Sequence, residues 1–506
     1  MRKKRFIINA AITSSSSAIM NLVGISFNVY ISNKVGPAGV GLFQLIMSVY
    51  GFSVTLASSG INLAATRMVA DDLARKEKNA TDYIMKKCLA YSAFFGFLSF
   101  ILLFTMSDYL ATNILNDKRT LLSLKALSIS MIPIAMSSSM SGYFIAVRRV
   151  YKSASAQLFE QFVKITVSII TLELFSKKGI EYACLCMVLS GSISEIASFL
   201  YLYLLFYIDK KRYKTNKKYD NAMFSLCKIA IPVAFSAYLR SALITIEHIL
   251  IPKSLKKSGL DSESSLKCYG IIHGMALPLL LFPSSVLKSF SGLLVPELSE
   301  CATLGHRRQI NHIISRMIKT TMLFSICVSG LYFTFADEIG YIIYKNANVG
   351  LYLRLLAPLC VVMYVDGIVD GMLKGLNQQV NSMWYNIIDS AVSVIAVITL
   401  LPRYGAGGYV AVIFISELLN AFLSLNRLIK ISDFKVQFFS WILIPTVTIY
   451  TVGTLVNKLI SANINAIYLI IKILFCIVFY LAMLIVFSII NLAPLKTIKR
   501  NRPASN

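Results

Sequence analysis

Charged side chains inside long apolar segments are the residues of this chain best suited to chemistry, because a charge in hydrocarbon is costly unless it faces a cavity or a partner. Arg240 and Glu247 lie seven residues apart in one such segment, so they share one face of a helix. Lys288 lies in the next apolar segment, and Arg67 ends an earlier one. Guanidinium and ammonium groups suit phosphate or pyrophosphate. We therefore predict that Arg67, Arg240, Glu247 and Lys288 line one net-positive cavity that binds an anionic head group.

An ordinary structural role stays open for each of these residues taken alone. A long basic side chain near a membrane surface can extend to the interface, and this alternative fits Arg67 best because it lies at the edge of its segment. A salt bridge between two helices would account equally well for Arg240 or Glu247.

A second set of acidic residues, Glu297, Asp366, Asp370 and Glu417, is a candidate for gating or for coupling to an ion. Asp366 and Asp370 are four residues apart with Lys374 next to them, a pattern that suits a polar helix end as well as a cation site. Glu297 lies at the inner end of its apolar segment. Glu417 follows a serine in a helical hairpin, as Glu195 does in an earlier hairpin.

Catalytic and metal-binding motifs are not found in the sequence. The nine cysteines are scattered, and the four histidines form no metal-spaced cluster with them. Walker, GxSxG and HExxH motifs are missing. A membrane glycosyltransferase or polymerase would need a larger outer loop than the segment 252–267. We therefore expect a transporter rather than an enzyme, with no cofactor and no metal.

The composition indicates the elements that position these residues. The chain has 506 residues, of which 56% are hydrophobic and only 15% charged, with a formal net charge of +26. Soluble domains carry about 25% charged residues, so this is the composition of an all-α polytopic membrane protein. A nucleic-acid binder is disfavoured, because the cations separate long apolar runs instead of forming one patch.

Fourteen apolar runs are long enough to cross a bilayer as helices, which takes about 20 residues. Helices are favoured over strands because the runs are too long, and lack the alternation, of a membrane barrel. The predicted spans are 6–32, 42–66, 88–107, 121–146, 156–176, 181–208, 223–251, 268–296, 320–337, 352–373, 384–401, 409–426, 438–457 and 466–491.

The distribution of Lys and Arg predicts the orientation. The first basic residues, Arg2 to Arg5, place the N-terminus inside, and an even number of spans returns the C-terminus to the same side. Most of the remaining basic residues then fall in inner loops, where they meet anionic lipids. We expect a multi-pass protein of a bacterial cell membrane with both termini in the cytoplasm.

Two similar hairpins suggest an internal repeat. FSKKGIEYACLCMVLSGSISE follows the fifth span and LPRYGAGGYVAVIFISE the eleventh, six helices later. This spacing fits two parallel six-helix repeats. We predict an N-terminal lobe at 1–208, a basic cytoplasmic linker at 209–222 and a C-terminal lobe at 223–430. Two extra helices and a basic cytoplasmic tail would occupy 431–506.

Three segments resemble a known family. VGPAGVGLFQLIMSVYGFSVTLASSGINLAATRMVAD, KIAIPVAFSAYLRSALITIEHILIP and YGIIHGMALPLLLFPSSVLKSFSGLLVPELSE are similar to the polysaccharide and lipid-linked oligosaccharide flippases of the multidrug/oligosaccharidyl-lipid/polysaccharide (MOP) exporter superfamily. The resemblance implies two six-helix lobes in a V shape, extra C-terminal helices and alternating access. It also implies movement of a lipid-linked precursor for spore cortex peptidoglycan. Related murein-precursor flippases carry arginines in the first helix, whereas 6–32 has no charged residue.

The leading functional hypothesis is a flippase for a polyprenyl-diphosphate sugar or peptidoglycan precursor, with that anionic lipid and the anionic lipids of the inner face as its partners. Nucleic acid is not expected as a partner, and other cell-wall synthesis proteins remain candidates. Two alternatives stay open. A multidrug exporter of the same fold would use unpaired acids such as Glu247 or the pair Asp366 and Asp370, and a scaffold for cell-wall assembly would transport nothing.

Overall fold

The computed structural model describes residues 2–74, 80–210, 221–432, 437–459, 465–487 and 489, without the side chains of 2–19, 177 and 288–293. Within these ranges the chain is helical, and no strand occurs. Nine described helices are long and apolar enough to cross a membrane, or eleven if each of two bent pairs is one span. Two of them, α1 (Arg2–Ser58) and α16 (Gln379–Ile431), each consist of two helices joined at a break. Counting these halves separately and adding α6 (Val150–Phe175) gives the fourteen spans expected from the sequence.

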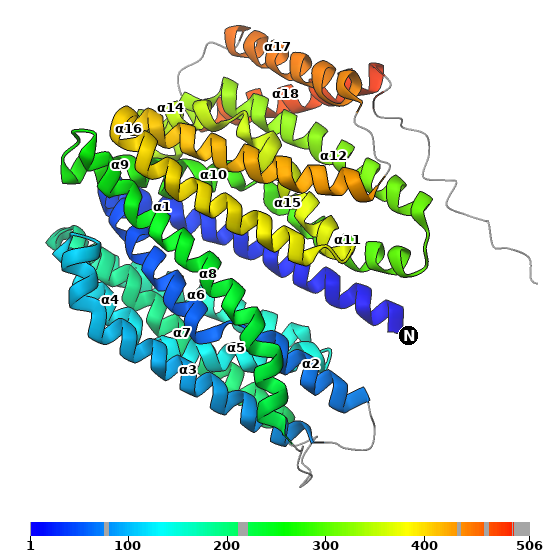
Figure 1. Cartoon of the computed structure of the whole chain (residues 1–506). Helices are drawn as coiled ribbons and strands as arrows, with labels where there is room; N and C mark the ends of the chain where they lie inside the picture. Colours follow the sequence, from blue (N-terminus) through cyan, green and yellow to red (C-terminus); the bar gives the residue numbers. More distant parts are fainter. Residues whose placement is uncertain are drawn as a thin grey trace, which may run out of the picture.

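Both breaks occur at a glycine, which allows the backbone conformation that each break requires. Gly36 in α1 has φ 78° and Gly405 in α16 has φ 54°, a region that glycine enters without a steric penalty. The chain reverses direction at both positions, as Figure 1 shows, so each merged helix is a hairpin. Gly179, with φ 122°, stands between α6 and α7 (Ile180–Lys210) in the same way. Three hairpins therefore turn on a glycine at the same end of the molecule.

The first bundle combines the second half of α1 with the helices up to α7. Apart from the dark blue first half of α1, it is the blue, cyan and teal part of Figure 1. Besides α6 and α7 it contains α2 (Ile61–Ala74), α3 (Thr81–Tyr109), η1 (Leu110–Ile114), η2 (Lys118–Thr120), α4 (Leu121–Ser128), α5 (Met131–Ala146) and η3 (Ser176–Lys178).

The second bundle is built around α16 and is coloured green to gold. Its other elements are α9 (Ser262–Tyr269), η5 (Gly270–Ala276), α10 (Leu277–Leu281), α11 (Ser284–Thr303), α12 (Arg307–Thr334), α13 (Ala336–Tyr344), α14 (Ala347–Leu356) and α15 (Leu359–Gly375). The elements η6 (Phe439–Leu443), α17 (Ile444–Leu459) and α18 (Ala466–Val486) pack on α12 and α13 at its outer edge.

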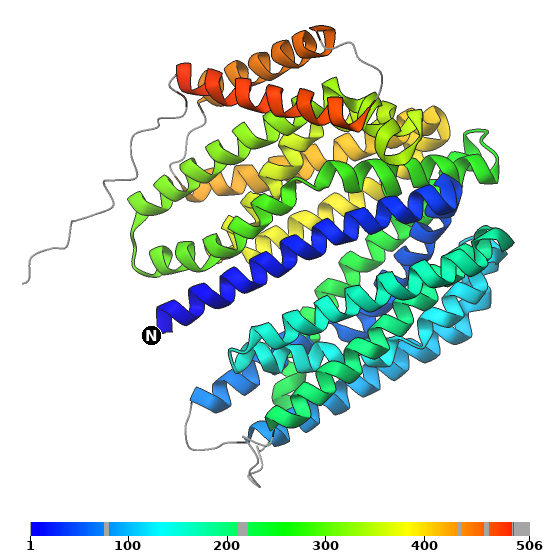
Figure 2. The same ribbon diagram turned by 180° about the vertical axis from the view of Figure 1, so that it is seen from behind.

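Two helices connect the bundles. α8 (Ala222–Lys257) packs on α16 of the second bundle and also on α1 and α2 of the first. The first half of α1 runs along the second bundle, as Figure 2 shows, and Asn28 Nδ2 donates to the carbonyl of Gly274 in η5 at 3.2 Å. The bundles converge at the end that holds Gly36 and Gly405, which we call the converging end, and separate toward the other end (Figures 1 and 2).

Close backbone packing joins the bundles at the converging end. A Cβ added to Gly41 of α1 would lie 2.0 Å from the carbonyl oxygen of Leu266 in α9, and a Cβ on Gly270 would lie 2.1 Å from the carbonyl oxygen of Pro37. Only small residues allow two helix backbones to approach this closely. The contact therefore depends on glycine on both sides of the junction.

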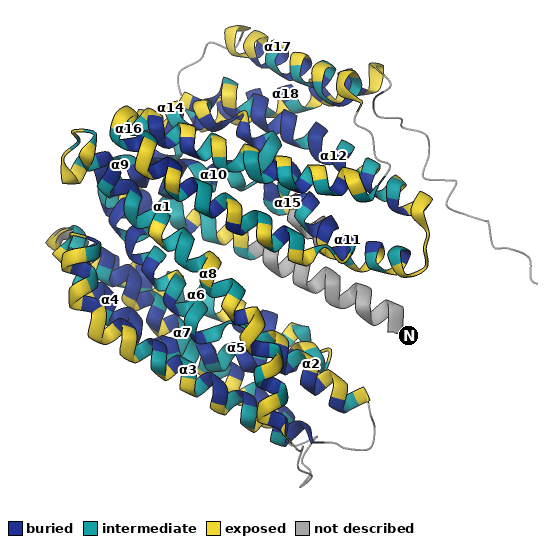
Figure 3. Ribbon diagram, in the orientation of Figure 1, coloured by how far each residue is buried: buried dark blue, intermediate teal, exposed yellow. Residues whose placement is uncertain are grey.

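The exposed surface is as apolar as a lipid-facing surface requires. Large side chains such as Phe162, Phe235 and Val478 are 66–70% exposed. Figure 3 shows exposed residues along the outward faces of both bundles and buried residues between the helices. A soluble monomer rarely exposes so much apolar area, whereas α-helices satisfy most of their backbone groups internally and are suited to hydrocarbon.

Candidate functional site

A cavity of about 360 Å³ lies between the two bundles, and we call it the inter-bundle cavity. One wall is the second half of α1, and the other consists of α8 and η5. Thr245 Oγ1 of α8 donates to the carbonyl of Ser48 at 3.0 Å and ties the two walls together. The lining residues are Gln44, Met47, Ser48, Gly51, Thr55, Ser241, Ile244, Thr245, His248 and His273.

Arg240 and Glu247 of α8 both lie toward α16. Ser393 donates a hydrogen bond to Glu247, and the Arg240 guanidinium interacts electrostatically with the carboxylate of Asp389. Asp389 and Ser393 are four residues apart on α16, which agrees with the shared face inferred from the spacing on α8. Arg240 is exposed, and neither it nor Glu247 lines the inter-bundle cavity.

A second cavity, of about 220 Å³, lies within the second bundle, and we call it the acidic cavity. Asp366 of α15 and Glu417 of α16 are its two charged lining residues. Asn420 Nδ2 donates to Asp366 Oδ2 at 3.0 Å, which connects α16 to α15. The other lining residues are Leu281, Ser284, Leu287, Met363, Tyr364, Gly367 and Ile368.

Four carboxylates form one electrostatic cluster around this cavity. Glu417 interacts with Asp366, Asp389 and Glu247, which come from three different helices. Ser416 Oγ donates to Asp389 Oδ1 at 2.7 Å. The sequence analysis did not select Asp389, although a lone Asp inside the predicted span 384–401 is the same signal that selected Glu417.

The first bundle contains a related cluster. Glu195 of α7 interacts electrostatically with Glu160 and Lys164 of α6, on the two sides of the hairpin that turns at Gly179. Asp389 and Glu417 occupy the two sides of the hairpin that turns at Gly405. The two hairpins thus carry carboxylates on both helices, but Lys164 supplies a positive charge inside the first cluster.

The remaining predicted site residues lie elsewhere. Arg67 on α2 and Glu297 on α11 are exposed, and neither lines one of the two cavities. Asp370 accepts from Lys374 Nζ at 2.5 Å and from Ser382, so it joins the end of α15 to the start of α16.

Lys288 lies on α11, but its side chain is outside the described part of the structure. The structure therefore brings Glu247, Asp366 and Glu417 together. The shared basic cavity stays a prediction.

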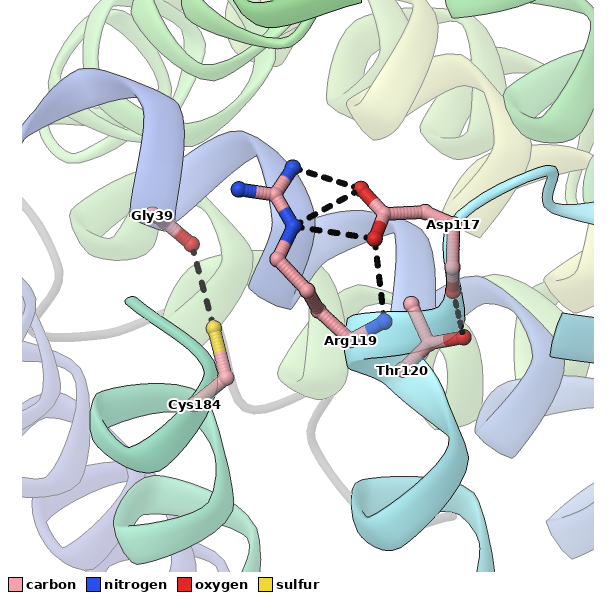
Figure 4. Close-up of polar contacts among 5 residues, drawn as sticks. All are labelled: Gly39, Asp117, Arg119, Thr120 and Cys184. Atoms are coloured by element: carbon pink, nitrogen blue, oxygen red, sulfur yellow. Dashed lines mark hydrogen bonds and ion pairs between the residues drawn. The ribbon is translucent and has the colours of Figure 1, made fainter. Parts of the chain in front are cut away.

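An ionic contact lies at the converging end (Figure 4). Arg119 Nη2 is 2.6 Å from Asp117 Oδ2, and Asp117 Oδ1 also accepts from the backbone N–H of Arg119 at 3.0 Å. The same guanidinium interacts electrostatically with Glu263 of α9, in the other bundle. Nearby, Cys184 Sγ donates to the carbonyl of Gly39 at 3.5 Å. Arg119 thus adds an electrostatic attraction across the glycine junction between the bundles.

Comparisons with known proteins agree with this architecture. The sequence profile of the family described as "Polysaccharide biosynthesis protein" matches residues 6–302. Stage V sporulation protein B of Bacillus subtilis (strain 168) is 26% identical over 413 residues, which cover 80% of each chain.

Two solved structures share the fold. The Lipid II flippase MurJ, in an inward closed conformation, superposes with a TM-score of 0.71 at 15% identity and covers 95% of this chain and 99% of its own. An inward-facing MATE family transporter of the MOP superfamily superposes with a TM-score of 0.62 at 12% identity, over 83% of this chain and 98% of its own. This multi-pass membrane chain therefore belongs to the polysaccharide biosynthesis protein family and has the fold of the MOP superfamily.

Proposed function

We propose that this protein is a flippase that moves a lipid-linked anionic sugar, such as a polyprenyl-diphosphate sugar or a peptidoglycan precursor, across the cell membrane by alternating access. The observation that carries the proposal is the polar inter-bundle cavity beside the junction of two bundles that separate toward the opposite end. The names of similar proteins, a sporulation protein and a Lipid II flippase, support spore cortex or cell-wall synthesis as the setting.

The basic residues would receive the diphosphate. Arg240 is exposed, and its guanidinium carries more N–H donors than one carboxylate such as Asp389 can engage, so donors remain for phosphate oxygens. In this proposal Lys288 shares that role, Arg67 stands near the inner entrance, and Glu247 orients Arg240. The lipid tail stays in the bilayer, along the last two helices.

The moving units in this proposal are the N-terminal lobe at 1–208 and the C-terminal lobe at 223–430, joined by the linker 209–222 and followed by 431–506. With both termini in the cytoplasm, the converging end faces outward, and the glycine junction closes the outer side with the Arg119–Glu263 attraction across it. Anionic lipids would hold the basic inner loops, and cell-wall synthesis proteins are candidate partners on the outer side.

The acidic cavity would couple transport to a cation or a proton. Asp366, Glu417 and Glu247 gather negative charge without a lysine or arginine among the residues that line the cavity. Glu297 and Asp370, at the inner ends of α11 and α15, would act in gating. A membrane potential could also contribute, at about 2.3 kcal/mol per charge per 100 mV.

A translocation assay tests the function directly. Purified protein in liposomes should move a fluorescent polyprenyl-diphosphate sugar between leaflets, and R240Q and K288Q should lower the rate. R403Q removes an exposed charge next to the turn at Gly405, at the converging end. It serves as the matched control and should transport normally. If wild-type liposomes move no such lipid, the flippase proposal is wrong. If R240Q and K288Q transport at the normal rate, Arg240 and Lys288 do not bind the diphosphate, but the flippase proposal stands.

A multidrug exporter is the second candidate, and the acidic cavity is the observation that favours it. A cationic drug would find Asp366 and Glu417 on a wall that is otherwise mostly apolar. Cells that express the protein should then extrude a cationic dye, and E417Q should abolish the extrusion. A scaffold that transports nothing would be inert in both assays.

A further inference from the structure

Two histidines in the wall of the inter-bundle cavity have no role in the mechanism so far. His248 comes from α8 and His273 from η5, and their ring centroids are 4.4 Å apart. Tyr269 supports both of them, because its hydroxyl lies 3.2 Å from His248 Nδ1 and its ring stacks on His273 at 5.3 Å between centroids. The imidazole pair is thus fixed on one side by a buried tyrosine while it borders the cavity.

The backbone that carries His273 is also held in place. The segment η5 is a seven-residue π-helix, and π-helical turns are frequent at functional sites. A Cβ on Gly274 would lie 2.3 Å from Val40 Cγ1, so η5 packs directly on α1. Asn28 Nδ2 donates to the carbonyl of Gly274. The cavity wall at His273 is therefore formed before any ligand arrives.

The rest of the wall is uncharged and largely polar. It contributes one amide and four hydroxyl groups beside two apolar side chains, and no carboxylate, lysine or arginine is among the lining residues. The amide is that of Gln44, the hydroxyl groups belong to Ser48, Thr55, Ser241 and Thr245, and the apolar side chains are Met47 and Ile244. The volume of about 360 Å³ lies at the lower end of the range of ligand pockets, roughly 300–1,000 Å³. A diphosphate would require cations, whereas neutral donors and acceptors match the hydroxyl and amide groups of a sugar.

We propose that the inter-bundle cavity is a subsite for the uncharged sugar ring of the lipid-linked substrate, with His248 and His273 as its hydrogen-bonding residues. The diphosphate then lies outside this cavity, near Arg240, which is the residue preceding Ser241 of the lining. This inference rests on the proposed function and deepens it, since it separates recognition of the sugar from neutralisation of the phosphate.

Gly51 provides a direct test because it lines the cavity and has no atom within 4 Å of an added Cβ. Leucine at this position would fill the cavity without displacing the backbone. Gly191 of α7 is an equally open helical glycine away from the cavity, so G191L is the matched control. The probes are a polyprenyl diphosphate that carries one N-acetylhexosamine and the same lipid without the sugar, bound to the purified full chain in nanodiscs.

Wild type and G191L should bind the sugar-bearing lipid more tightly than the sugar-free lipid. G51L should weaken binding of the sugar-bearing lipid by about tenfold or more and leave the sugar-free lipid unchanged. H248N and H273N should show the same selective loss by several-fold each, as removal of about one hydrogen bond predicts. H306N replaces an exposed histidine outside the cavity and should have no effect.

Equal losses for both lipids in G51L would overturn the sugar subsite, and so would unchanged binding of the sugar-bearing lipid. Equal affinity of wild type for the two lipids would also overturn it while the flippase proposal stands. Binding of neither lipid by wild type would reject the proposed function, and the subsite with it.

Discussion

Replacing Gly41 with alanine should shift the protein away from the conformation in which the converging end is closed. The added Cβ would lie 2.0 Å from the carbonyl oxygen of Leu266 and 3.2 Å from the backbone nitrogen of Gly270. These are backbone atoms, so no side-chain rotation relieves the overlap. An ordinary contact begins near 3.4 Å, and the two helices must therefore separate by about 1 Å or more.

The magnitude follows from the cost of overpacking. Forcing an extra methyl group into a close-packed contact costs about 1–3 kcal/mol. If that cost falls only on the closed junction, the ratio of open to closed molecules at this end rises about 5- to 150-fold. A transporter that visits both states should then spend far more of its time with the converging end open, and its turnover should fall.

Pulsed EPR distances across the junction would measure this shift. Spin labels at T112C and S262C report on the two bundles, because both residues are exposed at the converging end. Cys227 and Cys268, the two described cysteines that are only partly buried, are replaced by serine in this background. G41A should broaden the distance distribution and move it to longer distances.

The control is G51A on the same helix, where an added Cβ meets nothing within 4 Å. It should leave the distance distribution as in wild type. If G41A also gives the wild-type distribution in folded protein, the glycine contact does not set the closed state. The inference that a Cβ overlap at Gly41 opens the converging end would then be refuted.

Two further predictions concern charged contacts. R119Q should raise the rate at which a thiol reagent modifies S262C from the outer side, because Arg119 no longer attracts Glu263 across the junction; an unchanged rate would show that the glycines close this end without it. K472M should lower the unfolding free energy by about 3–5 kcal/mol, because Lys472 is 3% exposed and its Nζ lies 2.7 Å from Glu338 Oε1. In the double variant K472M/E338Q the unpaired carboxylate is gone, so much of the lost stability should return. Thermal unfolding in detergent would measure this, and equal melting temperatures for K472M and the double variant would contradict the explanation.

The number of helices could be predicted from the sequence because the thickness of the bilayer sets the length of each span. The reversal between the first two predicted spans coincides with Gly36, and that between the eleventh and twelfth with Gly405. Within the predicted span 268–296, α10 ends at Leu281 and α11 begins at Ser284, with Pro283 between them. Proline lacks a backbone N–H, so the helical hydrogen-bond pattern is interrupted at this position.

The rotation of each helix could not be predicted from one sequence. Spacing places Arg240 and Glu247 on one face of α8, but only packing against α16 decides what that face meets. His248 and His273 were set aside because their spacing suits no metal. The contact between the two rings depends on the π-helical turn of η5, and no residue pattern in the sequence predicts such a turn.

The two hairpins that resemble one another in sequence differ in charge, and this difference bears on the proposed transport cycle. In the first bundle, Lys164 offsets only one of the two carboxylates Glu160 and Glu195, so one acid stays uncompensated. In the second bundle, Arg240 lies beside Asp389 at the edge of the acidic cluster, and Glu417 is surrounded by other acids. Burying like charges without a cation is costly, so the second cluster, which holds more uncompensated acids, gains more than the first when a proton or a cation enters. An approximately symmetric fold would then carry most of its ion dependence in one lobe, next to the helix that also presents Arg240 to the substrate.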